Sequence, residues 1–211
     1  QFFNSVEKTI AIDVANHDII TLDKNQALSS TNAQTLEKAI DLVSRYGTIQ
    51  VINPPSNQVV TIDKEITIEG EDIDVTNWQI ANNSTEVLIE GLNFKNSTKN
   101  AIINNGEAMI SQCSFNGGND SAIYSNGDIT ILNCTFTNNQ ALNGAGVYID
   151  NRNNKTLISN CIFKRNTCTY NQNVSSGNGS CIYLNKGNDV EISYNVFKNN
   201  NGVNNITSST W

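Results

Sequence analysis

The sequence has few basic residues and no long hydrophobic run. Its 211 residues hold only 13 lysines and arginines against 20 aspartates and glutamates, which gives a formal net charge of -7. Nucleic-acid binding draws most of its affinity from clustered Lys and Arg, and here these residues are scattered, so a nucleic-acid partner is excluded. No stretch reaches the roughly 18 apolar residues that a membrane-spanning helix needs, so we expect no membrane span in this chain.

Charged residues are scarce as well, whereas asparagine is unusually abundant. With 38% hydrophobic and 16% charged residues, the chain is expected to fold as one compact body or as a regular stack. Asparagine accounts for about one residue in six, far above its usual share. Many asparagines occur in pairs, such as Asn138-Asn139 and Asn199-Asn200. Because asparagine favours turns, the chain is expected to turn often.

An internal repeat predicts the fold. One eight-residue phrase recurs without gaps, with isoleucine at its third and phenylalanine at its eighth position. A weaker copy runs from Ile66 to Ile73, and the copies at 66, 87, 108 and 129 start 21 residues apart before later intervals lengthen to 27 and 34. The five full copies are VLIEGLNF (Val87 to Phe94), AMISQCSF (Ala108 to Phe115), ITILNCTF (Ile129 to Phe136), TLISNCIF (Thr156 to Phe163) and VEISYNVF (Val190 to Phe197).

Each repeat predicts three short strands. Apolar and polar residues alternate within the phrase, and a break in phase indicates two strands that meet at a bend. A third strand follows at, for example, Ala122-Ile123-Tyr124 and Gly146-Val147-Tyr148. Three strands with tight turns fill about 21 residues, one coil of a solenoid whose coils stack about 4.8 Å apart. The predicted fold class is therefore all-β, a right-handed parallel β-helix with three sides.

Stacked coils place equivalent residues in ladders. Asparagines that follow phenylalanine by three residues, Asn139, Asn166 and Asn200, are expected to satisfy main-chain groups at a tight bend. The core is expected to contain one aliphatic, one aromatic and one cysteine ladder. Their members are Ile89, Ile110, Ile131, Ile158 and Ile192; Phe94, Phe115, Phe136, Phe163 and Phe197; and Cys113, Cys134 and Cys161.

The stack needs a cover at its open ends. Leu36, Ala39, Ile40 and Val43 have helical spacing, so the sequence predicts a capping helix of about three turns that begins after Thr31 or Asn32 and ends before Gly47. Strands are also expected at 9–14 and 18–23. We divide the single domain into an N-terminal lead-in with the capping helix (1–65), the coils (66–200) and a polar C-terminal tail (201–211).

Two further motifs carry a resemblance. Phe136-x-x-Asn139 and Phe163-x-x-Asn166, with Gly144-Ala-Gly-Val-Tyr148 between them, are similar to the repeats of archaeal adhesin-like proteins. They also resemble the passengers of chlamydial polymorphic membrane proteins. In those families F-x-x-N and G-G-A-[ILV] elements alternate along a parallel β-helix on the cell surface. The resemblance, which covers about residues 85 to 200, implies that fold and that location.

Residues for catalysis or metal binding are sparse. Polysaccharide lyases and hydrolases with β-helix folds need an arginine beside Ca²⁺-binding aspartates or two to three convergent carboxylates. The chain has three arginines and one histidine, His17, which is expected in a surface loop. We predict no catalytic residues, no cofactor and no metal site. The weak Ca²⁺ candidates are turn residues at equivalent positions, interrupted by Lys155: Glu107, Asp128 and Asp189.

Cysteines and sequons allow modification. Neighbouring rungs of the cysteine ladder are close enough for a disulfide, and Cys168 and Cys181 flank a polar insertion that a bridge between them would close. No C-x-x-C pair supports a zinc site. Glycans would be expected on a secreted or cell-surface protein. The candidate acceptors are Asn82, Asn83, Asn96, Asn133, Asn154, Asn173, Asn178 and Asn205.

These observations lead to an extracellular or cell-surface protein that is not an enzyme. We expect an adhesin or structural scaffold that binds carbohydrate or protein ligands through exposed Asn, Ser and Thr. Two alternatives stay open. One is a subunit of a self-assembling filament or coat, joined end to end or by donation of residues 1–14 to a neighbouring copy. The other is a polysaccharide lyase or hydrolase, which an outward row of carboxylates on one strand face would favour.

Overall fold

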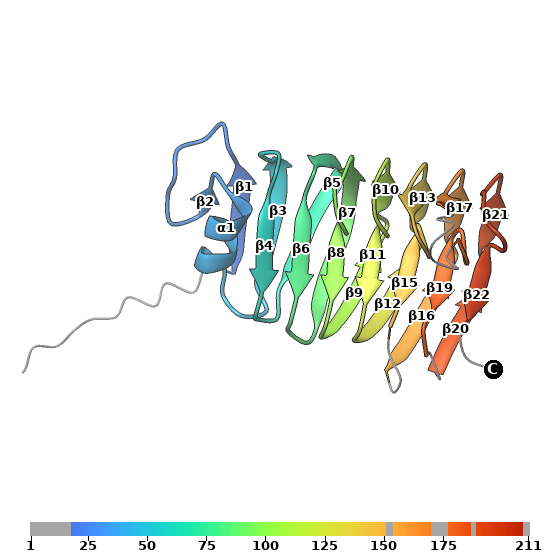
Figure 1. Cartoon of the computed structure of the whole chain (residues 1–211). Helices are drawn as coiled ribbons and strands as arrows, with labels where there is room; N and C mark the ends of the chain where they lie inside the picture. Colours follow the sequence, from blue (N-terminus) through green and yellow to red (C-terminus); the bar gives the residue numbers. More distant parts are fainter. Residues whose placement is uncertain (1–17, 151–153, 170–176, 187–188, 209–211) are drawn as a thin grey trace, which may run out of the picture.

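The chain folds into parallel β-sheets with one short helix at the N-terminal end. A computed structural model describes residues 18–150, 154–169, 177–186 and 189–208. Figure 1 shows the strands side by side along one axis, in the order of the sequence, from blue to red. His17, Asn173 and the strand expected at 9–14 lie outside the described residues.

The largest sheet has thirteen strands. They are β1 (Ile19–Asp23), β2 (Asn32–Ala33), β3 (Thr48–Asn53), β5 (Thr67–Thr76), β7 (Val87–Lys95), β9 (Glu107–Ser111), β10 (Ser114–Asn116), β12 (Asp128–Leu132), β13 (Thr135–Thr137), β16 (Lys155–Ser159), β17 (Ile162–Lys164), β20 (Asp189–Ser193) and β21 (Val196–Lys198).

Two smaller sheets complete the stack. The two-stranded sheet consists of β14 (Gln140–Ala141) and β18 (Thr167–Cys168). The seven-stranded sheet contains the third strand that the repeat predicted, and its members are β4 (Val59–Ile62), β6 (Gln79–Asn82), β8 (Ile102–Asn104), β11 (Ile123–Ser125), β15 (Val147–Ile149), β19 (Ile182–Leu184) and β22 (Ile206–Ser208). The prediction of an all-β protein built from parallel strands is confirmed.

Equivalent residues of successive repeats lie opposite one another. Ile110 pairs in register with Ile89 and Ile131, and Phe115 pairs with Phe94 and Phe136. Neighbouring phenylalanine rings from Phe94 to Phe197 stack with centroids 4.7 to 5.1 Å apart. The C-terminal members Ile192 and Phe197 are only partly buried, whereas the others are shielded from solvent. Packing between repeats therefore forms the core.

The bend inside each repeat requires left-handed backbone. The fifth position of the phrase has positive φ in every full copy, at Gly91, Gln112, Asn133, Asn160 and Tyr194. Left-handed backbone is unfavourable for most side chains and is tolerated best by glycine and asparagine. A second series occurs two residues after each phenylalanine: Asn96, Gly117, Asn138, Arg165 and Asn199. Asparagine thus recurs at positions where the backbone is left-handed.

The helix that covers the N-terminal end is shorter than the sequence predicted. Helix α1 spans Leu36–Leu42 and is capped by Thr35, whose side chain accepts a hydrogen bond from the Lys38 N–H. Thr31 and Asn32 are not its cap, because Asn32 belongs to β2 and its buried side chain donates to main-chain carbonyls. Val43 is buried with extended backbone and ends the helix. Within the described residues, no helix has the length and apolar character needed to cross a bilayer.

The C-terminal end contains a strand that the sequence did not predict. The segment expected as a polar tail includes β22, which pairs with β19. Its Ile206 lies opposite Ile182, so it continues the rows of the seven-stranded sheet. Sequence alternation over three residues is too short to distinguish such a strand from a turn.

Candidate ligand-binding groove

A groove crosses the thirteen-stranded sheet near the N-terminal end. It has a volume of about 840 Å³ and lies over β3, β5, β7 and the bend after β9. The register between β5 and β7 shifts between Glu69 and Ile73, so that three residues of β5 lie opposite the single residue Gly91. Gly91 is required there because a Cβ would lie 1.9 Å from the Gly70 carbonyl oxygen. The three bulge residues of β5, Gly70, Glu71 and Asp72, all line the groove.

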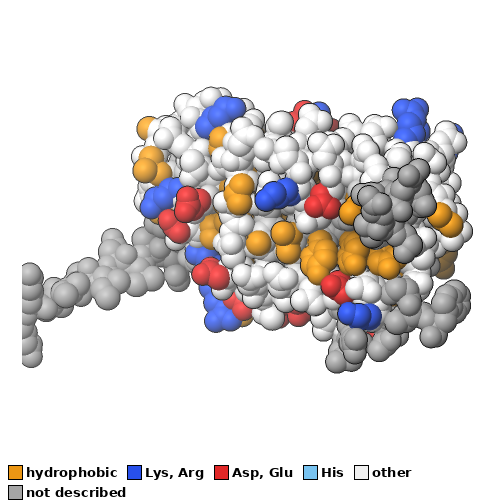
Figure 2. Space-filling view, viewed as in Figure 1, with side chains coloured by type: hydrophobic (Ala, Val, Ile, Leu, Met, Phe, Trp, Pro, Cys, Tyr) orange, Lys and Arg blue, Asp and Glu red, His pale blue; other side chains and the backbone are white. Residues whose placement is uncertain are grey.

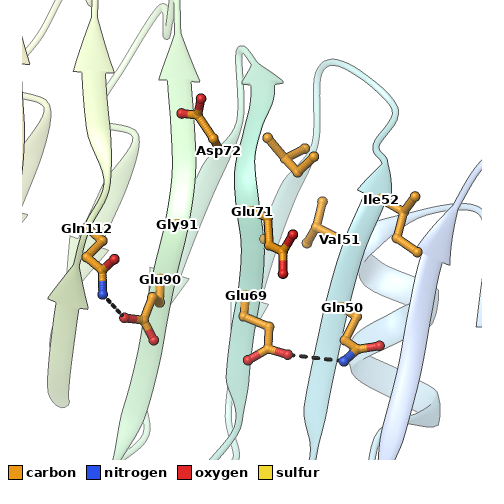
Figure 3. A pocket seen from close by; sticks show the side chains of 11 residues that line it. Gln50, Val51, Ile52, Glu69, Glu71, Asp72, Glu90, Gly91 and Gln112 are labelled. Atoms are coloured by element: carbon orange, nitrogen blue, oxygen red, sulfur yellow. Dashed lines mark hydrogen bonds between the residues drawn. The ribbon is translucent and has the colours of Figure 1, made fainter.

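Two neighbouring carboxylates lie along the floor of the groove, with an amide on either side of the pair. Gln50, Glu69 and Glu90 lie on successive strands in register. Gln50 Nε2 donates to Glu69 Oε1 at 3.2 Å, and Gln112 Nε2 donates to Glu90 Oε1 at 2.7 Å. Figure 3 shows both hydrogen bonds and the four side chains pointing into the open groove. The amides hold the carboxylates in place and leave other acceptor sites open to solvent.

The bulge adds two more carboxylates. Glu71 and Asp72 both line the groove and are exposed to solvent. Asn93 Nδ2 donates to Asp72 Oδ1 at 2.8 Å and to the Asp72 carbonyl oxygen at 3.1 Å, which fixes the left-handed turn at Asp72. The lining residues that the structure describes include no lysine or arginine. The groove therefore offers a negative, hydrogen-bonding surface.

One basic side chain lies close to the bulge. Lys95 Nζ forms an ion pair with Asp74 Oδ2. The hydrogen bond from Lys95 lowers the pKa of Asp74 below its usual value. Asp74 lies opposite Asn93 and Lys95 lies opposite Thr76, so the ion pair runs diagonally between β5 and β7. Lys95 is thus paired with a carboxylate that does not line the groove.

The groove presents both hydrogen-bond acceptors and hydrogen-bond donors. Carboxylate oxygens accept hydrogen bonds from hydroxyls, and glutamine amides both donate and accept. Among the described residues, no group of three His, Cys, Asp or Glu side chains is arranged to hold a metal ion.

The weak Ca²⁺ candidates lie elsewhere on this sheet. Glu107 and Asp128 are neighbours in register, and Lys155 pairs with Asp189 on the following rungs. The Asp128 side chain accepts a hydrogen bond from the Lys155 N–H at 2.8 Å. Lys155 therefore separates Asp189 from the other two carboxylates, as the sequence suggested.

The cysteines are free, buried thiols. Cys113, Cys134 and Cys161 form the expected stack, and each Sγ lies 3.6 to 3.7 Å from a carbonyl oxygen of the preceding repeat. Contact with the Cys113 thiol, and then with the Cys161 thiol, raises the pKa of Cys134 well above its usual value. Cys168 and Cys181 are also free, so the bridge that the sequence allowed between them is absent. Burial raises the pKa of Cys181 to about 12, which makes it a poor nucleophile at neutral pH.

The sequons differ in access. Asn83, Asn96, Asn133 and Asn205 are exposed, and Asn154 and Asn178 are half-buried. Asn82 is fully buried, and its Nδ2 donates to Asn104 Oδ1 and to the Glu107 carbonyl oxygen. A glycan on Asn82 would remove this hydrogen-bonding amide from the core, so the structure disfavours it as an acceptor.

The sequence argument missed the groove residues Glu69, Glu71, Asp72 and Glu90. A signal was present, because Glu69 and Glu90 share the fourth position of two consecutive phrases. The bulge that adds Glu71 and Asp72 has no comparable signature, since a register shift depends on the stacking of two repeats. No family model, curated protein or solved structure matches the chain.

Proposed function

We propose that the chain is a right-handed, three-sided parallel β-helix that acts outside the cell as a binding surface. Three observations support it. All paired strands in the described residues are parallel, each repeat contributes strands to separate sheets, and rungs follow the order of the sequence. Exposed sequons such as Asn83, Asn96 and Asn133 fit a secreted or cell-surface location.

The function is carbohydrate binding by an adhesin or scaffold, without catalysis. The observation that carries it is the row Gln50, Glu69, Glu90 and Gln112, in which each carboxylate accepts a hydrogen bond from an amide inside an open groove. In this groove the hydroxyls of a sugar chain would replace water at these acceptors and donors, while its ring carbons contact the exposed Ile52.

A glycan array followed by titration calorimetry tests this function. The double variant Glu69→Gln/Glu90→Gln keeps the shape of both side chains and removes both charges. We expect it to bind the selected glycan about tenfold more weakly or worse, because charge-assisted hydrogen bonds are lost. Glu37→Gln is the matched control, since Glu37 is exposed on α1 outside the groove. Unchanged binding by the double variant would show that the groove is not the glycan-binding site.

A polysaccharide lyase or hydrolase is the second candidate. It is favoured by the same carboxylates, because Glu69 and Glu90 form an outward pair on neighbouring strands. Incubation with neutral and uronate polysaccharides, followed by measurement of new reducing ends and unsaturated products, distinguishes the two functions. Turnover abolished by Glu69→Gln or Glu90→Gln would establish the enzyme and reject the proposal above.

Assembly into a filament or coat is the third candidate. Strands β20, β21 and β22 each have a partner strand on one side only, within the part of the chain that the structure describes. An open strand edge is a template for another chain. Electron microscopy of the purified protein would show filaments if this candidate is correct, and the variant lacking residues 1–14 would test strand donation.

A further inference from the structure

Three tyrosines form an outward row on the seven-stranded sheet. Tyr124, Tyr148 and Tyr183 are the central residues of β11, β15 and β19 and lie opposite one another in register. Their ring centroids are 5.4 and 5.1 Å apart, and all three side chains are half-buried. Figure 2 shows a row of hydrophobic side chains over the middle of this sheet. This tyrosine row belongs to a different sheet from the groove, so its function can be tested separately.

Polar partners fix the hydroxyl edge of the tyrosine row. Tyr124 Oη donates to Asp150 Oδ2 at 3.0 Å, and Asn185 Nδ2 donates to Asp150 Oδ1 at 2.8 Å. Burial, with the hydrogen bond to Asp150, raises the pKa of Tyr124 to about 12, and burial followed by the charge of Asp150 raises the pKa of Tyr148. The Tyr124 and Tyr148 phenols therefore stay protonated at neutral pH, and the Tyr124 O–H is held by Asp150.

A hollow lies directly beside the tyrosine row. It has a volume of about 290 Å³, and Tyr124 and Tyr148 form one of its walls. Asn100, Asp120 and Asn143 contribute polar groups, and the exposed Leu142 forms an apolar rim. A second hollow of about 400 Å³ shares Asp120 and Leu142 and extends this surface.

We propose that the tyrosine row and its hollow form a second carbohydrate-binding surface, which takes an extended, uncharged glycan lying along the stacking axis. The tyrosine spacing is close to the length of one sugar unit in an extended chain, so successive units can make equivalent contacts with successive rungs. Ring edges provide apolar contact for sugar C–H groups, and the phenols, Asn100 and Asp120 bind hydroxyls.

Charge selects the class of glycan. Among the residues that the structure describes, the hollow is lined by Asp120 and by no lysine or arginine, and Asp150 supports the row from beside it. Carboxylates repel polyuronates and sulfated chains. The Tyr124 and Tyr148 rings are stacked, with 24° between their planes, whereas the Tyr183 ring is tilted by 47° against Tyr148. Between Tyr124 and Tyr148 the facing ring surfaces are therefore covered, which disfavours a cation stacked on them. An uncharged glycan is not repelled by the carboxylates and needs no cation stacked on a tyrosine ring.

Hydroxyl-radical footprinting with cellohexaose, chitohexaose and maltohexaose tests the proposal on the native protein. A binding hexasaccharide should protect Tyr148 and Tyr183 from oxidation and leave Tyr46 and Tyr194 unchanged. Tyr46 and Tyr194 are exposed far from the row and serve as internal references. By calorimetry, Tyr148→Ser should weaken binding of the same hexasaccharide about tenfold, as expected for loss of a central aromatic contact.

The control variants keep the proposal falsifiable. Tyr194→Ser should bind like the wild type. If Tyr148→Ser fails to fold, the protection of Tyr148 and Tyr183 in the native protein still decides the proposal. Glu69→Gln/Glu90→Gln should leave protection of Tyr148 and Tyr183 intact, so failure of the groove and failure of the row are distinguishable. Absence of protection by all three hexasaccharides, equal protection by oligogalacturonate, or protection that rises with protein concentration alone would each overturn the proposal.

Discussion

Asn166 holds Asn139 through two hydrogen bonds to one atom. Its Oδ1 accepts from the main-chain N–H and from Nδ2 of Asn139, both at 3.1 Å, and both residues are buried. Nδ2 of Asn166 in turn donates to the Phe136 carbonyl oxygen at 2.9 Å. Asn200 repeats the arrangement one rung further along. Asparagine at one position thus satisfies main-chain groups at the turns after Phe136 and Phe163.

Removal of this amide should be costly. Asn166→Ala leaves the buried Asn139 N–H without its partner and removes the side-chain hydrogen bond to the Phe136 carbonyl. We expect the free energy of unfolding to fall by about 2 to 4 kcal/mol, because each unsatisfied buried group is penalised. Urea denaturation measures the loss. The matched control is Asn119→Ala, at an exposed asparagine, and a similar loss there would contradict the role assigned to the ladder.

The aliphatic ladder gives a second prediction. Ile131 is fully buried between Ile110 and Ile158, whereas its neighbour Thr130 faces outward and is half-buried. Ile131→Ala should lower the free energy of unfolding by about 2 to 5 kcal/mol, since it removes buried contacts and leaves a cavity. Thr130→Ala should change it by less than about 0.5 kcal/mol. Equal, small losses at both positions would mean that the inward and outward faces are reversed.

Left-handed backbone predicts a stabilising change. Arg165 has φ 55° at a position where three other repeats have asparagine, and its side chain is exposed. Arg165→Asn should raise the free energy of unfolding by about 0.5 to 1 kcal/mol, because asparagine tolerates this conformation better. Thermal denaturation provides the measurement. Arg165→Ala keeps the strain and should give no gain, so a gain in both variants would point to the lost charge instead.

An ion pair predicts a dependence on pH. Arg45 donates two hydrogen bonds to the Glu65 carboxylate, and they lower the pKa of Glu65 from 4.5 to about 2. A lowered folded-state pKa contributes stability above the unfolded-state value and loses it as the pH falls. The melting temperature of the wild type should therefore decline toward that of Glu65→Gln between pH 4.5 and about 2. A constant difference across this range would contradict the assignment.

The sequence determined the repeat, the ladders and the turns. Alternation of apolar and polar residues is a local property, so Ile131 could be assigned to the interior and Thr130 to the surface without a structure. Asparagine marks left-handed turns for an equally local reason, which made Asn139 and Asn166 recognisable. The helix was also visible from its periodicity, although its first residue was not.

The tertiary structure decided the surfaces. The groove exists because β5 carries three residues where β7 carries only Gly91, and such a shift is fixed by stacking of two repeats. The tyrosines were visible in the third strands, but only the common register of Tyr124, Tyr148 and Tyr183 makes them one surface. Strand β22 likewise forms because β19 offers it an edge. A ladder can be predicted from the spacing of residues, whereas a binding surface depends on how neighbouring rungs of different sequence are aligned.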